Sequence, residues 1–276
     1  MPRQKLGQHF LSDAGWRERI ARSIGVSAHS VGGPRTGDSD FVWIEIGAGH
    51  GEMTRHLLAN LRDVVAIEFD RKLAARLMEW AAQSDHLRIV EGDVLQADFR
   101  ALAAGRPVRV YGNLPYYITS PILHHLFQFA DIIGEIHIVI QLEVAFRLVA
   151  RPGTRDYGYL SVLTQYFSRP SLAMKIPPGA FRPPPEVGSA LVSLRLPGER
   201  RLEWPQERGF LDFVKLCFAQ KRKTLANNLR SLAAPAEVRS LLKAQSLRDD
   251  ARAEQLSVGE LVSLYRALPA PEAQDR

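Results

Sequence analysis

Short apolar runs that alternate with helical patterns dominate the first two thirds of the chain. The runs lie at 41–46, 64–69, 87–92, 108–113 and 136–141, and helical patterns lie between them at 52–62, 71–82, 119–129 and 143–150. Strands that alternate with helices of this length form βαβ units on a parallel sheet. The alternation therefore predicts an α/β fold with a mostly parallel sheet, and a polar/apolar run at 189–196 predicts a late strand that closes it.

From about Pro205 the pattern changes to helices only. Helical patterns lie at 206–220, 222–232, 235–243 and 257–268. A charged stretch with prolines precedes them, so we expect an α/β domain over 1–203 and a small all-helical domain over 204–276. Residues 30–40 are expected to form a surface loop, and the tail after Pro269 is expected to fray.

Composition limits the classes of function. The 276 residues are 46% hydrophobic and 24% charged, which is ordinary for a globular protein of about two domains. Cys217 is the single cysteine, so neither an internal disulfide nor a cysteine-cluster metal site is expected, and the chain fits a reducing cytoplasm. No apolar run reaches the length of a signal peptide core or a membrane span. A net charge of +6 favours a polyanionic partner.

A glycine-rich loop follows the first predicted strand. Residues 45–51 read EIGAGHG, and glycines at this place allow a tight turn and let a ligand lie against bare backbone. Glu68 ends the second predicted strand, roughly 20 positions after Gly47, where an acidic residue usually holds a ribose hydroxyl. Both a nicotinamide dinucleotide and S-adenosylmethionine (SAM) would fit these two features.

Two further features favour SAM. The third glycine falls one place early for a dinucleotide fingerprint, and Glu52 after it would repel a pyrophosphate at the helix N-terminus. Asp93 ends the third strand, where its carboxylate could accept a hydrogen bond from an adenine amino group, although this residue type is also typical of a helix cap. Carboxylates at successive strand ends line the crevice where open α/β sheets bind ligands.

The fourth strand ends in Asn113-Leu114-Pro115-Tyr116, which is a Pro-containing turn with more polar and aromatic groups than a turn needs. An amide oxygen and a backbone carbonyl can together accept both N–H bonds of an adenine amine, which directs its lone pair toward an electrophilic methyl group. Pro115 stiffens the turn, and the ring of Tyr116 offers a platform for a flipped-out base. The stretch predicts methyl transfer to an exocyclic amine.

These motifs, in this order, resemble the SAM-dependent ribosomal RNA adenine N6,N6-dimethyltransferases over nearly the whole chain. The resemblance also rests on KLGQHFL (5–11), FRPPPEVGS (181–189) and FAQKRKTL (218–225). It implies a Rossmann-like methyltransferase domain and a helical RNA-binding domain. The implied SAM contacts are His9, Leu11, Gly47, Gly49, Glu68, Asp93, Val94 and Asn113, and the implied catalytic residues are Asn113, Leu114, Pro115, Tyr116 and Phe181. Tyr116 and Phe181 would lie on opposite faces of the target adenine, and three prolines after Phe181 would preorganise its loop.

A one-signed basic stretch lies in the helical part. Residues 215–230 contain Lys215, Lys221, Arg222, Lys223 and Arg230 and no acidic residue. Solvated helix faces usually alternate in sign, whereas a basic face suits phosphate contacts. We expect Lys221, Arg222 and Lys223 to contact RNA, with Arg147 extending the patch.

The resemblance implies dimethylation of two adjacent adenines near the 3′ end of small-subunit (16S) ribosomal RNA, with a role in small-subunit biogenesis. A cytoplasmic location is expected from the single cysteine, and a monomer is expected because the sequence has no obvious oligomerisation seam. Two alternatives stay open. One is a large-subunit dimethyltransferase of the antibiotic-resistance type, which more often has isoleucine at the place of Leu114; the other is a non-catalytic ribosome-assembly factor. DNA adenine and glutamine methyltransferases commonly have two prolines where Leu114-Pro115 stands, so we disfavour them.

Overall fold

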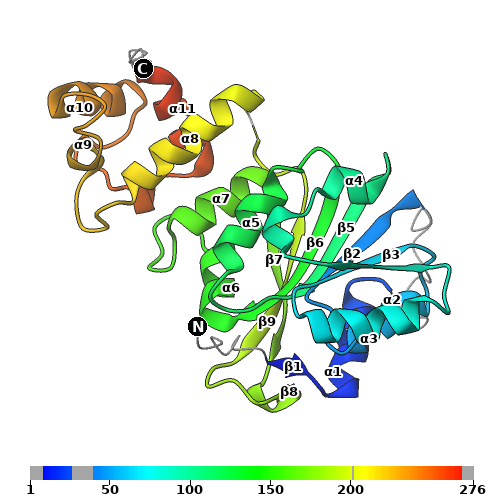
Figure 1. The fold of residues 1–276 in the computed structure, drawn as a ribbon. Coiled ribbons are helices and arrows are strands. Elements are labelled where there is room, and N and C mark those ends of the chain that lie inside the picture. Colours follow the sequence, from blue (N-terminus) through cyan, green and yellow to red (C-terminus); the bar gives the residue numbers. More distant parts are fainter. Residues whose placement is uncertain (1–8, 27–39, 201, 269–276) are drawn as a thin grey trace, which may run out of the picture. The chain divides into compact units, whose positions relative to one another are not determined.

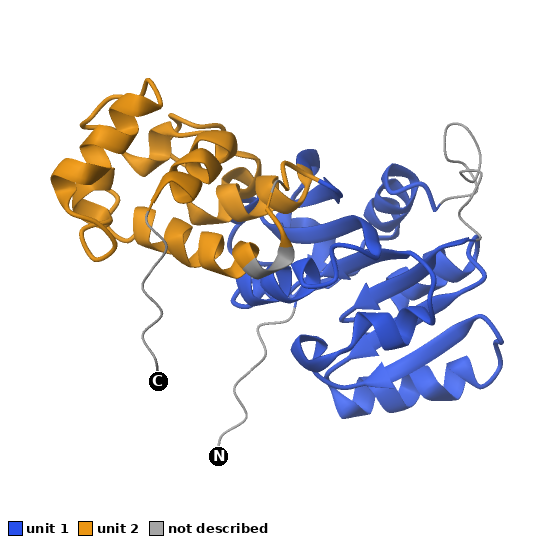
Figure 2. Ribbon diagram, turned by 90° about the horizontal axis from the view of Figure 1, so that it is seen from above, with its two compact units in different colours: residues 1–145, 170–197 blue, residues 146–169, 198–276 orange. Residues whose placement is uncertain are grey.

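The computed structural model describes residues 9–26, 40–200 and 202–268. The loop expected at 30–40, apart from residue 40, and the tail after Pro269 lie outside these residues. The chain forms two compact units, which Figure 2 colours separately. Unit 1 comprises Met1–Ala145 and Pro170–Pro197, and unit 2 comprises Phe146–Arg169 and Gly198–Arg276.

Unit 1 centres, among the described residues, on a seven-stranded sheet of order β4-β3-β2-β5-β6-β9-β7. In that order the strands are Leu87–Glu91, Val64–Glu68, Val42–Ile46, Val108–Asn113, Ile133–Gln141, Ser189–Arg195 and Arg169–Ile176. Strands β4, β3, β2, β5 and β6 pair in parallel, and β9 pairs antiparallel with β6. The α/β class, the mostly parallel sheet and the late closing strand are confirmed.

Six helices accompany this sheet in the described residues. They are α1 (Ala14–Ser23), α2 (Glu52–Leu58), α3 (Arg71–Ala81), α4 (Phe99–Ala103), α5 (Thr119–Phe127) and α6 (Leu142–Val149), and α6 runs into unit 2. Of these, α2, α3, α5 and α6 lie within the predicted helical ranges to within a residue, whereas α1 and α4 were not predicted. Figure 1 shows α1, α2 and α3 together beside β3 and β2. Asp13, Asp70 and Asp98 cap α1, α3 and α4, because each carboxylate accepts an N–H of the first helical turn.

The core explains why the central strands lack an alternating pattern. Every residue of β2 and β3 is buried, including Trp43, because helices cover both faces of a parallel sheet. The edge strand β4 buries only Leu87 fully. The central strands are therefore accessible to a ligand only at their ends.

A second, two-stranded sheet joins the start of the chain to the loop after β7. Strand β1 (Phe10–Leu11) pairs antiparallel with β8 (Phe181–Arg182), and the N–H groups of Ser12 and Asp13 both donate to the carbonyl of Ala180. Residues 9–13 are called the N-terminal strap below. This pairing holds the strap in place from a segment about 170 residues away.

Unit 2 is helical. Besides the end of α6 it contains α7 (Tyr159–Phe167), α8 (Trp204–Cys217), α9 (Leu225–Asn228), α10 (Pro235–Ala244) and α11 (Val258–Ala267). Short 3-10 turns lie at Val94–Gln96 and Pro178–Ala180 in unit 1 and at Ala253–Gln255 in unit 2. Buried rings of Tyr166 and Phe210 pack 5.0 Å apart, and Phe210 also contacts Tyr265.

Two details of the helical part differ from the sequence prediction. The helix predicted at 222–232 is wrong in extent, since only Leu225–Asn228 is helical and the Lys-Arg-Lys run before it is a turn. The helix α7 was not predicted, and it groups with the C-terminal helices although it precedes residue 203. The functional division at 203/204 stays a prediction, because compactness alone does not assign SAM or RNA binding.

No helix in the described ranges is long and apolar enough to cross a membrane.

A buried ion pair stabilises unit 2 and gives a test of its packing. Glu207 is 2% exposed, and its carboxylate accepts hydrogen bonds from Tyr166 and from two nitrogens of Arg200. We expect Glu207→Gln to lower the free energy of unfolding by about 3 kcal/mol, because Arg200 loses its counter-charge. Urea denaturation measures this. The exposed pair Asp212–Lys215 is the control, and Asp212→Asn should cost less than about 1 kcal/mol. Equal losses in the two variants would contradict the expectation.

Candidate functional site

A pocket lies at the carboxyl ends of β2, β3 and β5, beside the N-terminal strap. The residues that line it are His9, Phe10, Gly47, Gly49, Glu68, Asn113, Leu114, Pro115 and Tyr116. The carboxyl ends of parallel strands are where open α/β sheets bind ligands. The structure therefore brings the glycine loop, the acidic strand end and the Asn113 turn together, as the sequence predicts.

Glycines shape the loop, and Glu68 holds it. Gly47, Gly49 and Gly51 all have positive φ, at 72°, 59° and 76°, a region in which a side chain is strained. The buried carboxylate of Glu68 accepts the N–H of Gly49 at 2.7 Å and the N–H of Asp70 at 2.8 Å. Each carboxylate oxygen keeps a second lone pair, so Glu68 can also accept hydrogen bonds from a ligand's hydroxyl groups.

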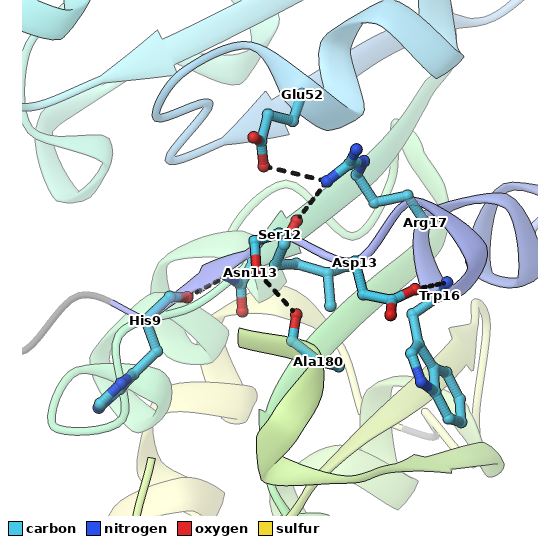
Figure 3. Close-up of polar contacts among 9 residues, drawn as sticks. His9, Ser12, Asp13, Trp16, Arg17, Glu52, Asn113 and Ala180 are labelled. Atoms are coloured by element: carbon cyan, nitrogen blue, oxygen red, sulfur yellow. Dashed lines mark hydrogen bonds and ion pairs between the residues drawn. The ribbon is translucent and has the colours of Figure 1, made fainter. Parts of the chain in front are cut away.

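The side-chain amide of Asn113 is oriented by the strap. Its Nδ2 donates to the backbone carbonyl of His9 at 2.9 Å, as Figure 3 shows. This bond uses the donor side of the amide, so the oxygen Oδ1 is the atom that can accept a hydrogen bond from a ligand. The next N–H, of Leu114, donates to the carbonyl of Val139 on β6, which fastens the turn to the sheet.

Tyr116 presents an aromatic ring at the same pocket. Its hydroxyl is 2.8 Å from Oγ of Ser189, and burial raises its pKa, so it stays protonated near neutral pH. The imidazole of His9 stacks on this ring, with centroids 5.5 Å apart and planes 25° apart. The hydroxyl contact holds the ring, and the stacking shows that a flat group fits against it.

Phe181, Asp93, Val94 and Leu11 are not among the residues that line this pocket. Phe181 has no exposed surface and packs in the hydrophobic core with Leu11. Asp93 caps the 3-10 turn by accepting the N–H of Leu95, and Val94 is buried. Asp93 and Val94 follow β4, which is next to β3. Contacts of these residues with SAM or adenine stay predictions.

The family comparison is decisive once this geometry is known. The model of the ribosomal RNA adenine dimethylase family matches residues 2–269. The chain belongs to this family. It is therefore a ribosomal RNA adenine methyltransferase, and the resemblance read from the motifs is confirmed.

Proteins of similar sequence or structure match this chain over nearly its full length. A ribosomal RNA small subunit methyltransferase A of Xanthomonas oryzae pv. oryzae is 41% identical over 268 residues, 97% of each chain. The protein of the same name from Xanthomonas axonopodis pv. citri is 42% identical, covering 95% of this chain and 94% of its own. A dimethyladenosine transferase from Plasmodium falciparum has the same fold, with a TM-score of 0.77 at 21% identity over 93% of this chain and 96% of its own. The 23S rRNA methyltransferase ErmE matches with a TM-score of 0.68 at 26% sequence identity, over 94% of this chain and 99% of its own.

The basic residues of the enzyme lie on a turn rather than a helix, which corrects the predicted helix face. Lys221, Arg222 and Lys223 are exposed on the turn between α8 and α9, and Nζ of Lys221 donates to the carbonyl of Arg155. Lys215 lies on α8 and pairs with Asp212 one turn earlier, at 2.9 Å. Arg147 is exposed on α6. The turn therefore retains a net positive charge, and Lys215 is neutralised.

The sequence indicated no role for one residue that lines the pocket, Phe10, or for one buried residue near the glycine loop in the chain, Glu45. Phe10 lines the pocket, and its ring lies so close to Gly49 that a Cβ there would meet it at 2.9 Å. Glu45 is buried at the end of β2 and accepts a hydrogen bond from Thr54. An acidic residue inside an apolar strand was the available signal for Glu45. The described ranges contain no group of three or more His, Cys, Asp or Glu residues that could hold a metal ion.

Glu45 predicts a pH dependence of stability. Burial, mainly, and the nearby charge of Glu68 together raise the pKa of its carboxyl from 4.5 to about 8, against the opposing effect of the Thr54 hydrogen bond. The folded enzyme thus binds an extra proton between these two values, so its stability falls as pH rises from about 4.5 to 8. Glu45→Gln should remove this contribution of a few kcal/mol. Unfolding from pH 5 to 8.5 tests it, and an unchanged pH dependence in the variant would exclude Glu45 as its source.

Proposed function

We propose that the enzyme transfers methyl groups from SAM to adenine N6, twice on each of two adjacent adenines near the 3′ end of small-subunit (16S) ribosomal RNA. The observation that carries this proposal is the Asn113 amide, whose Nδ2 is bonded to His9 so that Oδ1 is the acceptor at the pocket. The family supplies the reaction type, and the name of the relatives at 41–42% identity supports the small subunit.

The pocket fits SAM as the methyl donor. Gly47 and Gly49 line its wall with backbone because they have no side chains, and Glu68 can accept hydrogen bonds from ribose hydroxyls. His9 and Asn113 border the same space, and Asp93 on the next strand end is assigned to the adenine of SAM. SAM supplies the methyl group when it is bound.

Asn113 and its turn act on the target amine. Oδ1 of Asn113 and a backbone carbonyl of the turn accept the two N–H bonds of adenine N6, which directs the lone pair toward the methyl group. The same acceptors stabilise positive charge as it develops on the nitrogen. Tyr116 stacks on the flipped base, and Pro115 restricts the turn. A strong general base is not required, because the methylated amine loses its proton readily.

RNA binding is assigned to the basic turn of unit 2, with a contribution from Arg147. Lys221, Arg222 and Lys223 suit phosphate contacts, which supply affinity and register rather than sequence specificity. The substrate class is small-subunit RNA or its precursor particle, and a role in subunit biogenesis follows from that substrate. A cytoplasmic location, a monomeric state and the absence of a metal cofactor stay predictions.

The catalytic assignment predicts the effect of one amide. Asn113→Ala should lower the rate of adenine dimethylation at least about 100-fold, because one preorganised acceptor is lost. The assay combines purified enzyme, SAM and small subunits that lack the modification, and mass spectrometry detects N6,N6-dimethyladenosine in the digested RNA. Tyr116→Phe, which keeps the ring and loses the contact with Ser189, is the matched control and should stay within about tenfold of wild type.

The other outcomes of this assay separate the alternatives. Dimethyladenosine in large-subunit RNA instead of small-subunit RNA would indicate that the enzyme is of the antibiotic-resistance type. No product with wild-type enzyme, while binding to the subunit is retained, would favour an assembly factor and contradict the role of Asn113.

The basic turn predicts a salt dependence. The double variant Arg222→Gln/Lys223→Gln should weaken RNA binding and reduce the slope of log affinity against log salt by about 2, one unit for each lost phosphate contact. Lys215→Gln is the control with an already neutralised charge, and its slope should match wild type. Binding is measured by filter retention of small-subunit RNA from 50 to 200 mM salt, a range in which such contacts respond strongly. If Lys215→Gln changes the slope as much as the double variant, the turn is not the phosphate site.

A further inference from the structure

The N-terminal strap and the glycine loop form two sides of the same pocket. The strap contributes His9 and Phe10, and the loop contributes Gly47 and Gly49. The ring of Phe10 lies directly against Gly49, and it also contacts the ring of His50 at 4.7 Å. The space for SAM therefore depends on how firmly the strap is held to the loop.

Besides these ring contacts, one polar side chain connects the strap to the helix that follows the loop. Arg17 lies in the first part of α1, and its Nη1 donates both to the carbonyl of Leu11 in the strap, at 2.9 Å, and to Oε2 of Glu52, at 3.2 Å. Glu52 is the residue that follows the glycine loop, and it begins α2. Figure 3 shows the guanidinium of Arg17 reaching toward Glu52 from the helix after the strap.

The remaining polar atoms of this guanidinium add little to the connection. Nε of Arg17 is buried without a hydrogen-bond partner. The side chain of Arg17 is 15% exposed and that of Glu52 is 39% exposed, so water reaches the pair from the carboxylate side. Both contacts are made by the same nitrogen, and water can reach the pair, so it can break without unfolding of the sheet.

Other hydrogen bonds of the strap go to parts of the chain outside the glycine loop. His9 is bonded to Asn113 at the end of β5, and Ser12 and Asp13 are bonded to Ala180 beside β8. Neither tie involves the glycine loop. The Arg17–Glu52 pair is thus the polar contact, among those described here, that reaches from a strap carbonyl to the helix after that loop. A second pair, between Glu18 and His56 at 3.6 Å, joins α1 to α2 without touching the strap.

We propose that the Arg17–Glu52 ion pair is a latch that holds the strap against the glycine loop. The latch thereby sets the affinity for SAM and the rate at which the demethylated cofactor is released. Arg17 is a positioning residue, since it acts through the carbonyl of Leu11 and through Glu52. The inference rests on the proposed SAM site. It predicts that loss of the pair affects the cofactor and leaves RNA binding and the chemistry at Asn113 intact.

The test uses three variants of the full chain. Arg17→Met keeps the apolar stem and loses both polar contacts, Arg17→Lys keeps the charge, and Glu52→Gln keeps the shape and loses the charge. We expect Arg17→Met to raise the Kd and KM for SAM about tenfold, the size of one charge-assisted hydrogen bond. The kcat should be unchanged or higher and the KM for RNA unchanged, and Arg17→Lys should recover part of the affinity for SAM.

Coupling and folding controls complete the experiment. Arg17→Met/Glu52→Gln should bind SAM no more weakly than Arg17→Met alone, because both changes break the same latch. Arg22→Met loses the pair with Glu18 on the same helix and leaves the Glu18–His56 contact between α1 and α2 in place, so it should bind SAM as wild type does. If Arg17→Met does not fold, Arg17→Lys and Glu52→Gln carry the test.

Two results would overturn the latch. One is a folded Arg17 or Glu52 variant set that retains wild-type affinity for SAM, and the other is full additivity of the two changes. Failure of the proposed function is seen separately, as wild-type enzyme that binds SAM without forming dimethyladenosine. Wild-type enzyme that does not bind SAM would overturn both.

Discussion

The parallel pairing of β2 with β3 and β5 determines where Gly47, Glu68 and Asn113 of the pocket lie. Ile46 is opposite Ile67 on one side and Gly112 on the other, so the three strands end at the same level. The residues that come next are Gly47, Glu68 and Asn113, and the register places them around one pocket. Because these strands are buried along their length, their ends are the part that a ligand can reach.

Polar groups of this pocket are already held by backbone partners. Glu68 binds the N–H groups of Gly49 and Asp70, and Asn113 binds the carbonyl of His9. Groups that are oriented in advance need little rearrangement when charge develops in the reaction. The strap is part of this arrangement, since it supplies the carbonyl that turns the amide of Asn113 and the ring that covers Gly49.

The parts of the fold that local pattern encodes were predictable. The apolar runs of the five parallel strands, the glycine turn and the polar strand ends appear in the structure within a few residues of their predicted places. The strand β7 was not predicted, because it is an edge strand whose exposed residues alternate with half-buried ones and whose second residue is Pro170. The helix expected at 222–232 failed because Lys221, Arg222 and Lys223 have no apolar spacing to hold a helix against the core.

By itself the sequence determined the α/β class, the site at the ends of the strands and the chemistry of amine methylation, since periodicity, glycine and residue type act locally. Only the tertiary structure decided how those groups are used. The amide of Asn113 is turned by a carbonyl 104 residues earlier, the ring of Phe181 is buried against the core, and Arg17 bridges the strap to Glu52. These outcomes depend on contacts between distant segments, and no local pattern records which segments will meet.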